Sequence, residues 1–394
     1  MTRLDAARWR TRQGMARMLD ALGAEQGLTR YVGGAIRDDL LGIEVNDVDL
    51  ATRIAPDEVM ERLRKARIKA VPTGIDHGTI TAVSGGHPYE VTTLRRDVST
   101  DGRRATVAFT DDWREDAARR DFTINALSAD PLTGEIFDYF GGLDDIQRRR
   151  VRFIGDPLQR IAEDHLRILR FFRFHARFGA GEPGAEAVDA CSARANDLMA
   201  LSRERIADEL LKLLALPDPA PTVRIMLDRS ILAPVLPEIA TTAAEPLEAL
   251  IEAEREAGVA ADPVRRLAAL LPREAAVAND VAVRLRLSNK AKKRLVNAVT
   301  PALGEAPRAL GYRLGVESAV DRLLLAGQTD AARTIARWAP PKLPLGGGAL
   351  ISRGVTKGPD VARLLRRIED RWVAEDFPAG DRLDVIVAEE IGAR

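Results

Sequence analysis

Two aspartates one residue apart, Asp47 and Asp49, are the side chains of this chain best suited to carry out chemistry. Alternate residues of a β-strand point to the same face, so a strand here presents both carboxylates together and turns Val48 and Leu50 towards the core. Two carboxylates on a rigid strand suit a divalent cation that takes oxygen ligands, above all Mg²⁺. Two such ions can hold an attacking hydroxyl and a leaving pyrophosphate, so the pair indicates metal-assisted phosphoryl-type transfer.

A glycine pair, Gly33 and Gly34, lies upstream between the short apolar run Tyr31–Val32 and a helical pattern that ends at Gly42. The order strand, glycine turn, helix N-terminus is an anion-binding arrangement. Arg37 on that helix is positioned to contact a phosphate oxygen. A glycine pair alone more often marks only a turn, and a lone Asp-x-Asp is often only solvated. Together, in this order and within about twenty residues, they predict a phosphate and metal site.

This stretch resembles the signature of the class II nucleotidyltransferases, the family of CCA-adding tRNA nucleotidyltransferases and bacterial poly(A) polymerases. The resemblance covers residues 29–210 and continues more faintly to the end of the chain. It implies a head domain of the DNA polymerase β superfamily. The residues that carry it are Gly33-Gly34, Arg37-Asp38, Leu40-Leu41-Gly42, Asp47-x-Asp49 and Thr52.

The predicted fold class is α+β. The resemblance implies a polymerase-β-like nucleotidyltransferase head over residues 1–147 and a helical neck for base recognition over 148–216. A helical body and tail for tRNA binding follow over 217–394. Few aromatic residues and few β-branched runs after residue 155 favour helices there, and closely spaced prolines from Pro217 onward mark the second boundary.

Composition bounds the remaining properties. The chain has 394 residues, 46% hydrophobic and 30% charged, which predicts a globular, soluble protein of two to four structural units. Lys and Arg number 59, as do Asp and Glu, so any nucleic-acid contact must use local basic patches. The most basic stretch, residues 284–294, is either such a contact or a solvated face. The single cysteine excludes a disulfide framework.

Location and assembly follow from what the sequence lacks. No long apolar run or signal peptide is visible, which predicts a cytoplasmic protein with no membrane partner. The oligomeric state stays open between monomer and homodimer.

Two alternating, β-rich segments, residues 78–84 and 89–94, predict a hairpin. A lone Glu90 on the second strand is usually only solvated, but the superfamily resemblance puts a third catalytic carboxylate here, near Asp47 and Asp49. Residues 95–118 are polar and predict a mobile loop. In the resembling enzymes, a flexible loop at this place helps to shape the nucleotide pocket.

The run from Arg119 to Ala126 matches a further family motif. The resemblance implies that Arg120 contacts a nucleotide phosphate and that Asp121 and Asn125 lie near the ribose. The simpler alternative is that Asp121 only caps the helix that it opens.

A long helical pattern opens at Asp156-Pro157 and carries Asp164 and Arg167, three residues apart and therefore neighbours. As a surface ion pair they would contribute only ~0–1 kcal/mol. The alternative is base recognition. Cytosine and adenine both present an acceptor ring nitrogen beside an amino donor, which an Arg donor next to an Asp acceptor matches.

Uracil and guanine present a ring N–H beside a carbonyl oxygen, so the same pair would meet them donor to donor. Each unpaired buried polar group costs ~1–3 kcal/mol, which is enough for discrimination. In the family, the motif Glu-Asp-x-x-Arg at this place selects CTP and ATP without a template. The resemblance also makes Arg170 and Arg173 nucleotide or phosphate ligands.

The leading hypothesis is an enzyme: a Mg²⁺-dependent, template-independent CCA-adding tRNA nucleotidyltransferase. It would transfer CMP and AMP from CTP and ATP to the tRNA 3′ end, release pyrophosphate, and contact the backbone of the acceptor arm. The alternatives are a poly(A) polymerase, an enzyme that adds only CC or only A, and a non-catalytic RNA-binding protein. The intact pair of Asp47 and Asp49 argues against the last. No strongly basic run follows the base-reading helix, which favours CCA addition over poly(A) synthesis.

Overall fold

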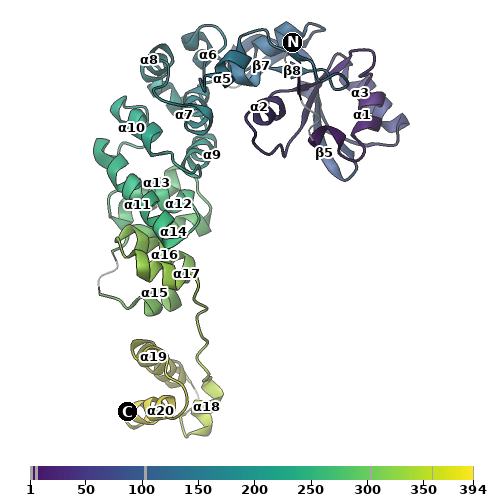
Figure 1. The fold of residues 1–394 in the computed structure, drawn as a ribbon. Coiled ribbons are helices and arrows are strands. Elements are labelled where there is room, and N and C mark those ends of the chain that lie inside the picture. Colours follow the sequence, from purple (N-terminus) through teal and green to yellow (C-terminus); the bar gives the residue numbers. More distant parts are fainter. Residues whose placement is uncertain (1–2, 5–7, 102–103, 302–303, 357, 394) are drawn as a thin grey trace. The chain divides into compact units, whose positions relative to one another are not determined.

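The computed structural model describes residues 3–4, 8–101, 104–301, 304–356 and 358–393 (Figure 1). The chain divides into two compact units. The first comprises Met1–Leu210 with Asp228–Val235, and the second comprises Leu211–Leu227 with Leu236–Arg394. The predicted division into head, neck, and body with tail is finer than these two units and stays a prediction.

The first unit begins with a mixed α/β segment that ends in α5. Its elements are η1 (Arg8–Thr11), α1 (Met15–Ala21), β1 (Thr29–Val32), α2 (Gly34–Leu40), β2 (Asp49–Thr52), α3 (Pro56–Lys65), β3 (Lys69–Gly74), η2 (Ile75–His77), β4 (Thr79–Ser84), β5 (His87–Thr93), β6 (Arg95–Asp101), β7 (Arg104–Phe109), α4 (Trp113–Ala118), η3 (Thr123–Asn125), β8 (Ser128–Ala129), β9 (Ile136–Phe137) and α5 (Gly142–Gln147).

A seven-stranded sheet with the order β3-β4-β5-β2-β1-β8-β9 forms the centre of this segment. Neighbouring strands are antiparallel except β2 and β5, which are parallel. The central strands bury Tyr31, Leu50 and Val91 completely. Trp9 packs edge-on against the Tyr31 ring at 4.8 Å, which covers the sheet from η1. The predicted hairpin is present, because β4 and β5 pair as antiparallel neighbours.

The register of the sheet brings together residues that are distant in sequence. Asp49 pairs with Val32 of β1 on one side and with Glu90 of β5 on the other. The prediction that Asp47 also lies on the strand is wrong, because β2 begins at Asp49. One reason is that β1 ends at Val32, where Gly33 turns away with a φ of +70°, so β1 has no residue left to pair with Asp47.

Residues 95–118 form regular structure, so the prediction of a loop is wrong. β6 and β7 pair as an antiparallel hairpin from Arg95↔Phe109 to Asp101↔Arg104, and residues 102–103 at its tip lie outside the described part. β7 is rich in residue types that are common in strands. Asp112 then caps α4 by accepting a hydrogen bond from the backbone N–H of Arg114 at 2.7 Å.

Five helices complete the first unit or lead out of it: α6 (Pro157–Glu163), α7 (Arg167–Phe178), α8 (Ala185–Ala193), η4 (Ala195–Ala200) and α9 (Arg203–Leu214). The predicted single helix after Asp156 is broken at Asp164. Asp164 is extended, with a φ of −151°, and its carboxylate accepts the backbone N–H of Leu166 at 3.1 Å. Such a local side-chain bond competes with helix continuation. The predicted apolar stripe is buried: Leu166, Ile168, Leu169, Phe171 and Phe172.

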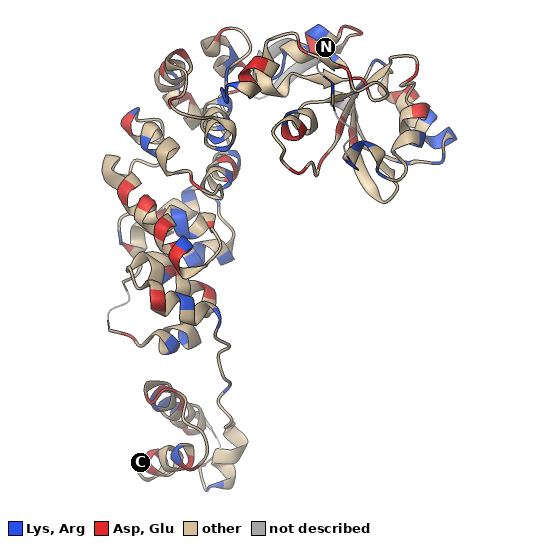
Figure 2. Cartoon of the chain, viewed as in Figure 1, with Lys and Arg blue, Asp and Glu red and all other residues tan. Residues whose placement is uncertain are grey.

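The second unit is helical, as predicted, so the α+β fold class is confirmed. Both charge signs are interspersed along its helices (Figure 2). None of the described helices is both long and apolar enough to cross a bilayer.

The elements of the second unit are α10 (Ala220–Asp228), η5 (Thr241–Ala243), α11 (Ala244–Ala257), α12 (Pro263–Leu270), α13 (Ala275–Arg284), α14 (Asn289–Val299), α15 (Pro307–Leu314), α16 (Val316–Leu325), α17 (Thr329–Ala336), α18 (Gly347–Ser352), α19 (Pro359–Ala374) and α20 (Asp381–Gly392).

Candidate active site

A cleft of about 390 Å³ in the first unit collects most of the residues singled out from the sequence. It joins the glycine turn after β1, the segment after α4, and the start of α7. Arg119 and Phe174 line it without having been predicted, whereas Arg173 does not line it. The lining residues are Gly33, Gly34, Arg37, Arg119, Arg120, Asp121, Asn125, Asp164, Arg167, Arg170 and Phe174.

The predicted carboxylates lie beside this cleft. The pKa of Asp49 is raised to about 6: burial raises it most, the charges of Glu90 and Asp47 also raise it, and the charge of Arg120 lowers it. Asp49 therefore interacts with both other carboxylates and with a cleft arginine. The sequence placed Glu90 near the aspartates correctly; its catalytic role stays a prediction.

The chemistry of these donors fits a divalent cation. Repulsion among the carboxylates raises the pKa of Asp49, and a bound cation would relieve that repulsion. Within the described residues, no group of three or more His, Cys, Asp or Glu forms a closed metal-binding set. Mg²⁺ is usually bound through one or two carboxylates plus substrate phosphates and water, so an open set suits an ion that arrives with a nucleotide.

The glycine turn brings backbone close to the cleft arginines. A Cβ on Gly33 would lie 3.0 Å from Nη1 of Arg120. Arg37 in α2 is 7% exposed, donates from Nε to Asp38 at 2.8 Å, and also donates to Oδ1 of Asn125. Burial lowers the pKa of Arg37, and Asp38 partly offsets that effect. Arg37 is thus a fixed positive charge at the wall of the cleft.

Gly33→Ala is expected to destabilise the protein and to reduce nucleotide transfer, because its backbone (φ +70°, ψ −125°) suits only glycine and the added methyl meets Arg120. We expect a loss of about 1–3 kcal/mol in the free energy of unfolding. Gly42→Ala is the matched control, since Gly42 also has positive φ (+68°) but nothing lies within 4 Å of its Cβ position. Urea unfolding and transfer assays compare the two. Equal effects on transfer would contradict the role of the turn.

Two acids with little exposed surface organise the cleft arginines. Asp116 is 3% exposed and pairs with Arg119 at 2.9 Å and with Arg120 at 3.3 Å. Burial alone would raise the pKa of Asp116, but the charges of Arg120 and Arg119 hold it below its usual range. The carboxylate of Asp116 therefore holds Arg120, the arginine whose charge acts on Asp49, in place.

Asp121 is the second of these acids. Its Oδ2 accepts from Nε and Nη2 of Arg170 at 2.9 and 2.7 Å. Its Oδ1 accepts from the backbone of Phe122 and from Nδ2 of Asn125, both at 2.9 Å. Burial alone would raise the pKa of Asp121, but Arg170 and these hydrogen bonds lower it. Asp121 therefore ties Asn125 in η3 to Arg170 in α7.

Arg173 is not among the residues that line the cleft, and its role as a nucleotide ligand stays a prediction. Its guanidinium instead pairs with Glu209 of α9, a residue only 4% exposed. The reason is helical geometry, because each three-residue step turns the side chain further around α7. The Phe174 ring lies under the guanidinium groups of Arg173 and Arg170, at 4.7 and 5.2 Å.

Asp164 and Arg167 both line the cleft, and each pairs with another residue, which argues against the alternative that they form a simple ion pair with each other. Arg167 pairs with Glu163, and Asp164 pairs with Arg205 of α9 at 2.8 Å. The break between α6 and α7 separates the two side chains that a continuous helix would have made neighbours. Sequence analysis missed Glu163, Arg205 and Glu209 as partners. Arg205 and Glu209 lie four residues apart on α9, and this charged spacing on one helix face is the signal that could have identified them.

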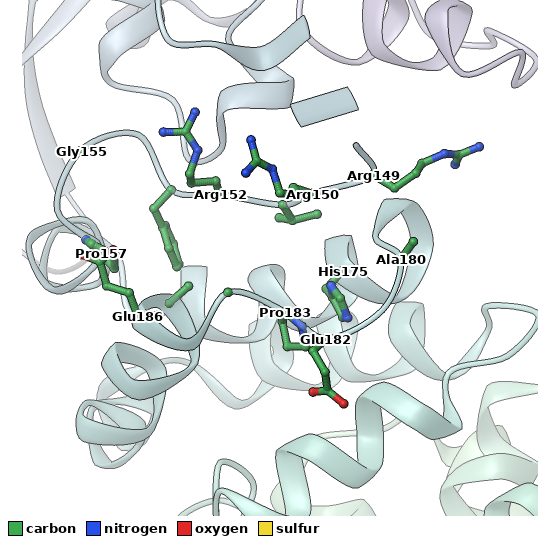
Figure 3. A pocket seen from close by; sticks show the side chains of 14 residues that line it. Arg149, Arg150, Arg152, Gly155, Pro157, His175, Ala180, Glu182, Pro183 and Glu186 are labelled. Atoms are coloured by element: carbon green, nitrogen blue, oxygen red, sulfur yellow. The ribbon is translucent and has the colours of Figure 1, made fainter. Parts of the chain in front are cut away.

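A separate cavity of about 300 Å³ lies between the segment before α6 and the start of α8, and it shares no lining residue with the cleft (Figure 3). Arg150 pairs with Asp144 at 2.8 Å, and Arg152 with Asp145 at 2.9 Å. Figure 3 shows these two guanidinium groups turned away from His175. The cavity wall is therefore formed by their stems rather than by their charges.

Paired carboxylates on a polymerase-like sheet, beside an arginine-rich cleft, define an enzyme that transfers nucleotides. Comparison with known protein families supports this class. Residues 29–152 match the family model described as "Poly A polymerase head domain". Residues 185–242 match the one described as "Probable RNA and SrmB- binding site of polymerase A".

Two relatives and one solved structure narrow the class. The mouse "CCA tRNA nucleotidyltransferase 1, mitochondrial" is 33% identical over 382 residues, which cover 91% of this chain and 86% of that protein. The "CCA-adding enzyme" of Oceanobacillus iheyensis is 42% identical over 185 residues, 46% of this chain and 45% of that one. The Bacillus stearothermophilus CCA-adding enzyme in complex with CTP superimposes with a TM-score of 0.74 at 26% identity, covering 96% and 98% of the two chains. The chain belongs to the class II nucleotidyltransferases, in the family of CCA-adding tRNA nucleotidyltransferases.

Proposed function

We propose that this protein adds C, C and A in turn to the 3′ end of tRNA, using CTP and ATP and no template. The observation that carries this proposal is the single cleft in which Asp164 and Arg167, an acceptor and a donor for a base edge, lie with the arginines and glycines suited to a triphosphate. One cleft with one acceptor and one donor suits cytosine and adenine alike.

Asp47 and Asp49 would hold divalent cations, with Mg²⁺ the ion that the oxygen donors suit best. When bound, the cations neutralise the triphosphate and favour ionisation of the attacking 3′-hydroxyl. The remaining work falls to the chain itself. Arg120 and Arg37 bind phosphate oxygens, the backbone N–H groups after Gly33 contribute further donors, and Glu90 completes the negative surface that faces the ions. No covalent intermediate with the protein is needed, since positioning and charge neutralisation carry this kind of transfer.

Base selection rests on Asp164 and Arg167. The carboxylate accepts from the exocyclic amino group of cytosine or adenine, and the guanidinium donates to the adjacent ring nitrogen. Arg170 lies in the same cleft and is the third side chain of α7 suited to contact the nucleotide. Asp121 and Asn125, which are bonded to each other at 2.9 Å, are suited to the ribose.

Metal binding should weaken in acid, because the pKa of Asp49 is raised to about 6. Above that pH the carboxylate is ionised and free to bind; below it a metal ion must displace a proton. We expect the apparent dissociation constant for Mn²⁺, measured by electron paramagnetic resonance, to rise up to about tenfold per pH unit below pH 6. Asp49→Asn should bind weakly at every pH. A constant affinity from pH 5 to 8 would contradict this assignment.

The test of the function uses a tRNA transcript that lacks its last three nucleotides, with Mg²⁺ and each nucleotide in turn. CTP alone should give two additions, and a third should appear only when ATP is also present. A long ladder with ATP alone would instead identify a poly(A) polymerase. An enzyme that stops after CC with both nucleotides present, or that adds only A to a CC-ending transcript, has partial specificity.

We also propose that tRNA is the macromolecular partner and that the protein is cytoplasmic. The basic stretch around α14, where Lys290 and Lys293 are exposed, is suited to the tRNA backbone. Monomer and homodimer remain equally compatible with the chain. Cytoplasmic localisation stays a prediction, since the relatives include a protein named as mitochondrial.

A further inference from the structure

The acceptor of the base-reading pair is held by a residue outside the cleft. Asp164 is 29% exposed at its side chain and lines the cleft. Nη2 of Arg205 donates to both of its oxygens, at 3.1 and 2.8 Å. Oδ1 also accepts the backbone N–H of Leu166 at 3.1 Å. The carboxylate is therefore fixed from α9 and from the turn before α7, and it keeps lone pairs free for a ligand.

The donor of the pair is held by a different set of groups. Nη1 of Arg167 donates to Glu163 and to the backbone carbonyl of Arg160 at 2.9 Å. Its Nη2 donates to the backbone carbonyl of Arg119 at 3.2 Å. Glu163 also pairs with Arg160 at 2.7 Å, so Arg167 is anchored between α6 and the end of α4. Each member of the pair thus has its own counter-charge.

This separation has a chemical consequence. An Asp and an Arg that bond to each other satisfy their own donors and acceptors and offer little to a base edge. Held by Arg205 and by Glu163 instead, the two side chains present one acceptor and one donor independently.

We propose that Arg205 is a specificity-determining positioning residue. It keeps the carboxylate of Asp164 away from Arg167 and aimed into the cleft, so that cytosine and adenine are accepted and uracil and guanine are rejected. The inference rests on the proposed function and deepens it. Without Arg205, only the backbone N–H of Leu166 among the contacts described still holds the carboxylate of Asp164, so the carboxylate can turn towards Arg167.

The test compares three variants of the full-length protein. Arg205→Met keeps an unbranched apolar stem and removes the charge. Arg205→Lys keeps the charge and removes the planar fork. Arg203→Met is the matched control, because Arg203 lies on the same helix and its guanidinium contacts only the sulfur of Met199 among the contacts described, at 3.8–3.9 Å. Addition of C, A and U to a truncated tRNA is measured over a range of nucleotide concentrations.

For Arg205→Met we expect the KM for CTP and for ATP to rise about tenfold, while kcat at saturation changes little. The preference for CTP over UTP should fall by a similar factor. Arg205→Lys should recover part of both losses, and Arg203→Met should behave as the wild type. A general packing defect would not produce this split between KM and kcat or the change in base preference.

A double variant tests whether Arg205 affects base selection through Asp164 or independently of it. If Arg205 acts through Asp164, adding Arg205→Met to Asp164→Ala should change the CTP-to-UTP ratio no further. An additive loss would overturn the proposal, as would an unchanged KM and ratio in Arg205→Met. If Arg205→Met does not fold by circular dichroism, the Arg205→Lys ratio decides: wild-type discrimination overturns the inference, and a reduced ratio supports it. A wild type that adds neither C nor A would overturn the proposed function and this inference together.

Discussion

Replacing Asp49 with asparagine is expected to reduce nucleotide addition by about a thousandfold or more, because it removes one of two carboxylates that can hold the metal ions. Asp49 sits at the start of β2 between Val32 and Glu90, so the isosteric amide occupies the same place. Primer extension with labelled tRNA measures the loss. Asp57→Asn, an exposed acid in the first turn of α3, is the control and should keep full activity.

The same variant should be at least as stable as the wild type. The folded-state pKa of Asp49 is about 6, above its usual value, so its contribution to stability is present in acid and is lost as the pH rises through about 6. At pH 7.5 the ionised carboxylate therefore costs the fold about 1–3 kcal/mol, which asparagine relieves. An inactive variant with an unchanged or higher melting temperature supports a metal-site role. An active variant would contradict it, and a strongly destabilised variant would indicate a structural role.

The second large effect is expected for Asp121→Ala, which should lower the free energy of unfolding by about 3–5 kcal/mol. The substitution leaves the guanidinium of Arg170 without its closest carboxylate and removes the acceptor of Asn125. Chemical denaturation measures the change. Asp144→Ala is the control, because Asp144 is 48% exposed and pairs only with exposed arginines, a kind of pair worth ~0–1 kcal/mol.

The pH dependence of this effect has the opposite sign to that of Asp49. The pKa of Asp121 is lowered in the folded protein, so its stabilisation is present above the unfolded pKa and is lost as the pH falls through the folded value. The difference in stability between the wild type and Asp121→Ala should therefore be full at neutral pH and shrink in acid. A difference that is constant with pH, or no larger than that of Asp144→Ala, would contradict the ion-pair account.

The sequence alone predicted the features that depend on short-range patterns. The alternation around Asp49 and Glu90 predicted strands that the sheet contains, and the apolar stripe that includes Leu169 is buried as expected. The glycine pair at Gly33 marks a turn of positive φ beside the cleft. Such features could be predicted because burial of alternate or helically spaced residues is a local constraint.

Ion-pair partners could not be predicted in this way. Arg205 lies 41 positions after Asp164, and nothing in the spacing shows that the chain reverses to bring them together. The break in the helix at Asp164 depends on a side-chain bond to Leu166 that competes with the helical pattern. Arg173 was assigned to the nucleotide by family motif alone, and its ion pair with Glu209, a buried acid on another helix, depends on tertiary structure that the spacing does not show.

The measurement that tests the central claim most directly is the affinity of the full-length protein for CTP, ATP, UTP and GTP, with Mg²⁺ and without tRNA. If Asp164 and Arg167 read the base, CTP and ATP should bind with similar dissociation constants, and UTP and GTP at least about tenfold more weakly. Asp164→Ala should bring the four values together. Equal binding of all four nucleotides by the wild type would contradict selection of the base by the protein itself.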